Sequence, residues 1–313
     1  MKRRQHPTPL VGIVGPTASG KSELAFALAH RLPVEILVAD SRQVYRGMDI
    51  GTAKPDPAAR ASIPHHLLDL VAPDQPFTVA EWVERARAMV PAVAARGHLP
   101  LIVGGTGLYV TSLVDGYDYA AQPWSPELRA RLGAQLETDG LAALARRLEA
   151  GDPEAAARID LRNPRRVLRA LERVEAGGGG VAPRAEPWPG RLALLGLSRP
   201  RAVLERRIDD RARRMFETGL LDEVRALLDA GYGDDLAPMT GHGYREAARH
   251  LSGEWPLAEA VAVTARRTCQ YAKRQLTWFR RDPRIVWLPA GDLRGDDPTL
   301  VERAVGAVNR LIG

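Results

Sequence analysis

The segment 15–22 constrains this chain most, because its sequence, Gly-Pro-Thr-Ala-Ser-Gly-Lys-Ser, has the glycine and lysine spacing of a Walker A loop. An apolar run at 10–14 precedes the segment, and residues 23–29, which have a helix-forming composition, follow it. Strand, glycine loop and helix therefore occur in the order that a P-loop requires. The backbone N–H groups of such a loop and the N-terminus of the next helix form a concave site for a diphosphate or triphosphate.

Every residue of this loop is a candidate for binding a diphosphate: Gly15, Pro16, Thr17, Ala18, Ser19, Gly20, Lys21 and Ser22. The ammonium group of Lys21 is expected to reach phosphate oxygens, and the hydroxyl of Ser22 is expected to bind Mg²⁺ as a cofactor. The loop alone leaves open which pyrophosphate compound it holds.

Strands and helices alternate in the first third of the chain. Apolar runs at 10–14, 34–39 and 99–103 predict buried strands, and residues 79–96 predict an amphipathic helix. This alternation indicates a parallel sheet that is covered by helices. Ligands of such sheets bind at the carboxyl ends of the strands, which is where the segment 15–22 lies.

The strand pattern then stops and returns later. Residues 118–176 are rich in Ala, Leu, Arg and Glu and predict helices, while the glycines at 177–180 and the proline-rich 183–189 predict a linker or exposed loop. Apolar runs at 192–197 and 285–287 predict further strands. We therefore predict an α/β fold with a P-loop NTPase-like parallel sheet core and an inserted all-helical domain. The expected parts are 1–116 for the first part of the core, 117–190 for the inserted domain, and 191–313 for the second, mostly helical part of the core.

The charge of the chain suggests a polyanionic partner. Basic residues number 44 against 38 acidic ones, so the net charge is +6. Arginines cluster at 158–173 and 266–284, and either cluster could simply be a solvated helix face. Several such clusters in a basic protein favour a nucleic acid as the partner.

Other features exclude several protein classes. The single cysteine, Cys269, excludes an internal disulfide framework and a cysteine-based zinc site. No apolar run has the length of a membrane span, and residues 1–7 lack the apolar segment of a signal peptide. We therefore expect a cytoplasmic enzyme without a membrane partner.

Two polar residues lie at or just beyond the ends of predicted strands. Asp40 comes after the run 34–39, where its carboxylate could bind Mg²⁺, accept a proton from an acceptor nucleophile, or merely cap a turn. Thr106 lies in a Gly-Gly-Thr-Gly turn after the run 99–103, which by itself is weak evidence of a site. This segment lacks the Asp-x-x-Gly and Asn-Lys-x-Asp patterns of GTPases, so a switch protein is not expected.

Seven segments match one known family in its order along the chain. They are 15–22; 40–55, beginning Asp-Ser-Arg-Gln-Val-Tyr; 64–67, Pro-His-His-Leu; 104–109, Gly-Gly-Thr-Gly-Leu-Tyr; 207–211, Arg-Ile-Asp-Asp-Arg; 243–245, Gly-Tyr-Arg; and 272–280, Ala-Lys-Arg-Gln-Leu-Thr-Trp-Phe-Arg. On these segments the chain closely resembles the tRNA dimethylallyltransferases, the bacterial tRNA isopentenyltransferase family.

The resemblance implies that the P-loop holds dimethylallyl diphosphate rather than a nucleotide. The acceptor would be N6 of the adenosine on the 3′ side of the anticodon, in the anticodon stem-loop of a tRNA, and the enzyme is expected to act as a monomer. The resemblance further implies a catalytic set in which Asp40 is the general base, Thr106 helps to hold the reacting groups, and Arg211 stabilises the leaving pyrophosphate with Lys21.

The resemblance also implies tRNA contacts from several segments. They are Asp40, Ser41, Arg42, Gln43 and Thr106 near the acceptor; Arg129, Arg165 and Arg166 in the inserted domain; and Gly243, Tyr244, Arg245, Lys273, Arg274, Gln275, Thr277 and Arg280 near the substrate channel. The family often has Asn-Asp before the arginine pair, whereas this chain has Arg162-Asn163-Pro164 there.

Three other functions remain as alternatives. A P-loop small-molecule kinase would use the same loop for ATP but has no need of a basic helical insertion. An adenylate isopentenyltransferase would share the chemistry but act on free AMP, without arginines away from the pocket. A non-catalytic RNA-binding P-loop protein would keep the arginines but has no use for Asp40.

Overall fold

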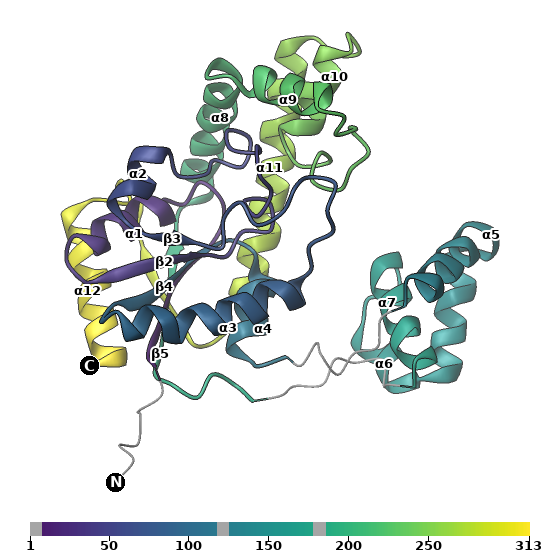
Figure 1. Ribbon diagram of the computed structural model, residues 1–313, viewed down its shortest axis with the longest axis horizontal. Helices are drawn as coiled ribbons and strands as arrows, with labels where there is room; N and C mark the ends of the chain where they lie inside the picture. The colour runs from purple at the N-terminus through teal and green to yellow at the C-terminus, as the bar shows by residue number, and fades with distance from the viewer. Residues whose placement is uncertain (1–7, 118–124, 178–185) are drawn as a thin grey trace. The chain divides into compact units, whose positions relative to one another are not determined.

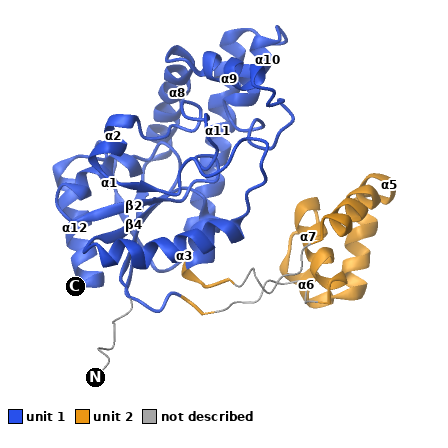
Figure 2. Cartoon of the chain, viewed as in Figure 1, with its two compact units in different colours: residues 1–113, 188–313 blue, residues 114–187 orange. Residues whose placement is uncertain are grey.

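The chain folds into two compact units. The computed structural model describes residues 8–117, 125–177 and 186–313. One unit combines residues 1–113 with 188–313, and the other comprises residues 114–187 (Figure 2). Most of the glycine and proline segment that predicts a linker, residues 178–185, lies outside the described residues.

Unit 1 is built on a six-stranded sheet in which every pair of neighbours is parallel. Its order is β3-β2-β4-β1-β5-β6, with β1 in the interior. The strands are β1 Leu10–Val14, β2 Val34–Val38, β3 His65–His66, β4 Leu99–Gly104, β5 Leu192–Ser198 and β6 Ile285–Pro289. The predicted α/β fold with a parallel sheet is confirmed. The two-residue β3 escapes prediction because it has no apolar run.

Helices cover the sheet and extend beyond its carboxyl edge. They are α1 Lys21–Ala29, α2 Pro57–Ser62, α3 Val79–Ala95, α4 Gly107–Val114, α8 Arg201–Glu217, α9 Leu220–Asp229, α10 Tyr244–Leu251, α11 Leu257–Phe279 and α12 Pro298–Ile312. Helices α8 and α11 pack side by side (Figure 1). In the part of the chain that the structure describes, no helix has the length and apolar character to cross a membrane.

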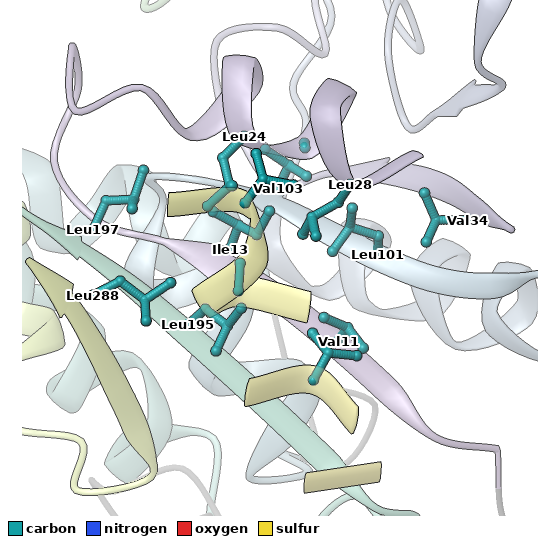
Figure 3. Packing of buried hydrophobic residues seen from close by; sticks show 14 of the residues in the cluster. Val11, Ile13, Leu24, Leu28, Val34, Leu101, Val103, Leu195, Leu197 and Leu288 are labelled. Atoms are coloured by element: carbon teal, nitrogen blue, oxygen red, sulfur yellow. The ribbon is translucent and has the colours of Figure 1, made fainter. Parts of the chain in front are cut away.

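The core of unit 1 packs α1 and α12 against one face of the sheet. Ile13, Leu101 and Leu195 come from three adjacent strands and are fully buried with Leu24 and Leu28 of α1 (Figure 3). Burial of each such side chain contributes about 1.5–3 kcal/mol of hydrophobic stabilisation. This packing holds the start of α1, and hence the P-loop, rigidly against the sheet.

On β2, a buried carboxylate joins the strand to its neighbours. Glu35 is 2% exposed and accepts hydrogen bonds from both sides of the Arg96 guanidinium, at 2.7 and 2.5 Å. Rings of His66 and His98 lie 2.6 and 2.7 Å from the same carboxylate. Hydrogen bonds from Arg96 hold the pKa of Glu35 well below its ordinary value.

The described part of unit 2 is helical. Its helices are α5 Pro126–Gly151, α6 Pro153–Arg158 and α7 Pro164–Glu175, and α5 breaks at Gly140, where φ is 78°. Each helix starts with a proline in the first turn and a capping side chain, from Ser125, Asp152 and Asn163 respectively. Leu132, Leu148 and Val167 are fully buried in a separate core. This unit therefore has its own hydrophobic centre.

Candidate active site

The P-loop connects β1 to α1 at the carboxyl edge of the sheet. Its backbone has positive φ at Gly15 (136°), Ala18 (60°) and Gly20 (97°). Gly20 is the N-cap of α1 and provides no side chain to cap the helix, so N–H groups of the first turn are left for another acceptor. The loop thus has the backbone form and the free helix N-terminus of an anion site.

Two cations adjoin this loop. The ammonium of Lys21 donates to the carbonyl oxygen of Pro16 at 2.7 Å, and the guanidinium of Arg211 on α8 is 3.4 Å from the hydroxyl of Thr17. Burial, and then the charge of Arg211, lower the pKa of Lys21 to about 7, although the nearby Asp40 opposes this change. Burial also lowers the pKa of Arg211, which still remains charged. A bound diphosphate would neutralise this mutual repulsion.

Two further arginines donate hydrogen bonds to backbone carbonyl oxygens of the loop. Arg207 of α8 donates to the carbonyl oxygen of Ala18 at 2.9 Å and pairs with Glu23 at 3.0 Å. Arg199, which follows β5 directly, donates to the carbonyl oxygens of Ser19 and Gly291 at 2.7 and 2.8 Å. Sequence reasoning gave Arg199 no role. The signal that could have found it is its place at the end of a central strand.

The acceptor side of the site forms where β2 and β4 end. The backbone N–H of Ser41 donates to Thr106 Oγ1 at 3.0 Å, and the N–H of Thr106 donates to the carbonyl oxygen of Ala39 at 3.1 Å. Asp40 Oδ1 accepts the N–H of Arg42 at 2.9 Å. A Cβ at Gly104 would lie 2.1 Å from the carbonyl oxygen of Ala39, so only glycine allows this approach. The structure thus brings the segment of Asp40 and Ser41 against Thr106.

Two residues expected to contact tRNA have buried side chains in unit 1. Tyr244 is 2% exposed, and its hydroxyl donates to Glu223 at 2.6 Å. Gln275 is 6% exposed and bonds to the backbone of Thr17 and Gly105. Both side chains are thus bonded within unit 1, and their contact with tRNA stays a prediction. Both sit on the inward faces of their helices, which a motif match does not reveal.

The remaining candidates near the site fall into two groups. Arg42 and Gln43 are partly buried and donate to the carbonyl oxygens of Ala237 and Thr52, at 2.5 and 2.9 Å. Gly243 is the buried N-cap residue of α10. Five candidates have exposed side chains on or beside α10 and α11: Arg245, Lys273, Arg274, Thr277 and Arg280. Of these, Arg274 lies 5.8 Å from the ring centre of Tyr271. The exposed five remain candidates for phosphate or base contacts.

The three arginines predicted to bind tRNA in unit 2 differ in their surroundings. Arg129 forms two hydrogen bonds to the buried Glu172, at 2.6 and 3.0 Å, so its charge is already compensated within the unit. Arg165 and Arg166 are exposed at the start of α7, and their guanidinium groups have no ion-pair partner among the described residues. They are therefore the stronger candidates for a polyanion.

The expected Mg²⁺ ion would take most of its ligands from the bound substrate rather than from the protein. Among the described residues, no group of three or more His, Cys, Asp and Glu side chains could hold a metal ion. Ser22 is exposed in the first turn of α1, beside the free helix N-terminus. Mg²⁺ commonly keeps several waters and binds few protein ligands together with substrate phosphates. A serine hydroxyl beside a diphosphate fits that pattern.

Comparison with known proteins identifies the family. The model of the IPP transferase family matches residues 43–282. The tRNA dimethylallyltransferase of Heliobacterium modesticaldum is 44% identical, over 96% of this chain and 95% of the relative. That of Roseiflexus castenholzii is 47% identical, over 96% of this chain and 98% of the relative.

Solved structures agree with the sequence relatives. A tRNA isopentenylpyrophosphate transferase from Bacillus halodurans aligns with a TM-score of 0.71 and 38% identity, over 96% of this chain and 97% of that one. A eukaryotic dimethylallyltransferase acting on tRNA aligns with a TM-score of 0.82 and 25% identity, over 97% of this chain and 79% of that one. The chain belongs to the IPP transferase family.

Proposed function

We propose that this protein is a tRNA dimethylallyltransferase. It transfers the dimethylallyl group of dimethylallyl diphosphate to N6 of the adenosine on the 3′ side of a tRNA anticodon and releases pyrophosphate. The observation that carries the proposal is the meeting of two half-sites in unit 1: a P-loop with Lys21 and Arg211, and the Asp40 segment bonded to Thr106. The relatives that carry this name align over nearly the whole chain.

The donor half-site suits departure of a diphosphate. Breaking the allylic C1–O bond moves an electron pair onto the leaving oxygen, so positive charge must already be in place around the phosphates. Lys21, Arg211 and the N–H groups at the start of α1 supply that charge. A Mg²⁺ ion bound by Ser22 and the phosphates would supply further charge neutralisation when present.

The acceptor half-site suits activation of an amine. The exocyclic N6 of adenine is a weak nucleophile, and it must lose a proton as its lone pair forms the bond to C1. The carboxylate of Asp40 accepts that proton, while its hydrogen bond from the Arg42 N–H fixes its orientation. The bond between Thr106 and the Ser41 N–H holds this segment at the end of β4. Alignment of amine and C1 within the site supplies much of the rate.

The arginines of unit 2 suit the phosphates of the acceptor. Arg165 and Arg166 present two exposed guanidinium groups at the start of α7, where the helix dipole also favours negative charge. Loop adenosines in RNA can be unstacked and inserted into a pocket at a modest cost. The stem of the tRNA then provides the phosphates that these arginines bind.

An assay with radiolabelled dimethylallyl diphosphate distinguishes the proposed function from its alternatives. The protein is incubated with radiolabelled dimethylallyl diphosphate and either unmodified tRNA or AMP, and ATP hydrolysis is followed in parallel. The proposal predicts label in tRNA alone and no ATP turnover. Label in AMP would indicate an adenylate isopentenyltransferase, and ATP hydrolysis stimulated by an acceptor would indicate a kinase or ATPase.

A further inference from the structure

The side chain of Gln275 joins two backbone segments of the site. Its Oε1 accepts the N–H of Thr17 in the P-loop at 2.8 Å, and its Nε2 donates to the carbonyl oxygen of Gly105 at 2.9 Å. A backbone N–H can only donate and a backbone carbonyl can only accept, so the orientation of this amide is unambiguous. Gln275 therefore bridges the donor loop and the turn that leads to Thr106.

The bridge leaves no room for another side chain. A Cβ at Gly105 would lie 2.1 Å from Nε2 of Gln275, so the amide rests directly on the glycine backbone. Gln275 is also only 6% exposed. An amide in this place that lost either bond would leave a buried polar group unpaired, which is costly.

Tyr271 extends the bridge toward the acceptor half-site. It lies four residues before Gln275 on α11, so the two side chains share one face of the helix. Its hydroxyl lies near the side chains of Thr106 and Gln275. Burial, and then the charge of Asp40, raise the pKa of Tyr271 to about 12, which keeps the phenol protonated. Thr106 in turn accepts the N–H of Ser41.

We infer that Gln275 is a positioning residue that forms a strut between the two half-sites, from Thr17 on the donor side to Gly105, the residue before Thr106, on the acceptor side, and that Tyr271 supports this strut. Neither residue is needed to touch the diphosphate or the base. The strut instead sets the separation between the bound diphosphate and the segment that carries Asp40. This inference rests on the proposed function, because it assigns the two half-sites to one reaction.

The strut matters for the reaction because it fixes the distance between the donor and the acceptor. Group transfer requires the attacking nitrogen within about 3–3.5 Å of C1, and a misplacement of about 1 Å can reduce the rate roughly 100-fold. The donor loop and the acceptor turn come from different strands, β1 and β4, and α11 is the element whose side chains bond to both. Loosening the strut should therefore affect donor placement and turnover before it affects tRNA binding.

Gln275→Glu tests the inference by changing one atom of the bridge. The introduced carboxylate cannot donate to Gly105, and its charge lies beside the diphosphate loop. We expect the KM for dimethylallyl diphosphate to rise about 10-fold or more at pH 8, because the carboxylate repels the diphosphate and the strut has lost its bond to the carbonyl oxygen of Gly105. The KM for an anticodon stem-loop should stay within about 2-fold of the wild type, since neither side chain of the strut is needed to touch the stem-loop. Lowering the pH should bring the donor KM of the variant back to that of the wild type at the same pH, because a protonated carboxyl can donate to Gly105 again.

Gln270→Glu is the matched control, since Gln270 is exposed on the same helix and the substitution adds the same charge. Thermal unfolding of each variant verifies that it folds. A donor KM in Gln275→Glu that equals that of Gln270→Glu would overturn the inference. So would an equal rise in the KM of both substrates, which would indicate a general structural defect.

Tyr271→Phe tests the other end of the strut and removes only the hydroxyl. We expect kcat to fall about 10-fold with the donor KM little changed, because Thr106 loses a polar neighbour on the face of α11 that carries Gln275. An unchanged kcat would remove Tyr271 from the strut. Wild-type transfer to the stem-loop is measured in the same assay. If the wild type transfers nothing, the proposed function fails, and binding of dimethylallyl diphosphate alone to wild type and Gln275→Glu still tests the bridge to the P-loop.

Discussion

Protonation of Lys21 should make donor binding depend on pH. Burial and the neighbouring Arg211 lower the pKa of this ammonium to about 7. Since each pH unit changes the ratio of the two forms tenfold, the charged fraction falls from about 0.9 at pH 6 to about 0.1 at pH 8. If only the ammonium form binds phosphate well, the Kd for dimethylallyl diphosphate rises about tenfold across this range. The sign is fixed: raising the pH removes positive charge and weakens binding.

Isothermal titration calorimetry without tRNA measures this effect, because the donor is not consumed in the absence of an acceptor. Bound phosphate oxygens favour the charged form of Lys21, so binding at pH 8 should take up a proton. The observed enthalpy should then depend on the ionisation enthalpy of the buffer. Lys21→Arg is the control, since a guanidinium stays charged throughout this range and leaves only the titration of the ligand itself.

The reasoning is refuted by two results together. One is an equal change of Kd with pH in the wild type and in Lys21→Arg. The other is a binding enthalpy at pH 8 that is independent of the buffer. Such results would mean that Lys21 is already fully charged at pH 8, in spite of its burial and of Arg211.

Three further perturbations test other parts of the molecule. Asp40→Asn should bind tRNA normally but lose about 100-fold or more in single-turnover rate, as expected for a missing general base, and a near-normal rate would exclude that role. Replacing both Arg165 and Arg166 with Ala should make the slope of log affinity for tRNA against log salt shallower by about one per lost phosphate contact, whereas an unchanged slope in filter binding would remove α7 from the interface. Glu35→Gln should lower the free energy of unfolding by about 2 kcal/mol at pH 7, because Arg96, His66 and His98 lose a buried, charged acceptor. The pKa of Glu35 is lowered in the folded state, so this difference should shrink in urea titrations as the pH falls below the ordinary value of 4.5.

The local sequence was sufficient to predict those parts of the site that follow from the order of strands and helices along the chain. Asp40 and Thr106 could be placed at one edge of the sheet because each follows a buried strand, and parallel strands end at the same edge. The spacing of glycines similarly predicts the backbone of the P-loop, where Gly15 and Gly20 have positive φ. These features depend on residues that are close together in the chain.

The sequence was insufficient to predict the role of a side chain that bonds to a residue far away in the chain. Gln275 and Thr17 are separated by most of the chain, and nothing near Gln275 shows that its amide points inward. The same holds for Arg129, whose charge is compensated by Glu172 of another helix. A motif identifies such residues, but only tertiary packing shows whether they bind a ligand or hold the site in shape.

The identity of the acceptor atom is the most direct test of the central claim. Two anticodon stem-loops are compared as acceptors of labelled dimethylallyl diphosphate: one has adenosine on the 3′ side of the anticodon, and the other has purine riboside there, which lacks only the exocyclic amine. The proposed reaction predicts one dimethylallyl group per adenosine stem-loop and no label in the purine stem-loop. Equal labelling of the two, or labelling of neither by the folded enzyme, would contradict transfer to N6 of that adenosine.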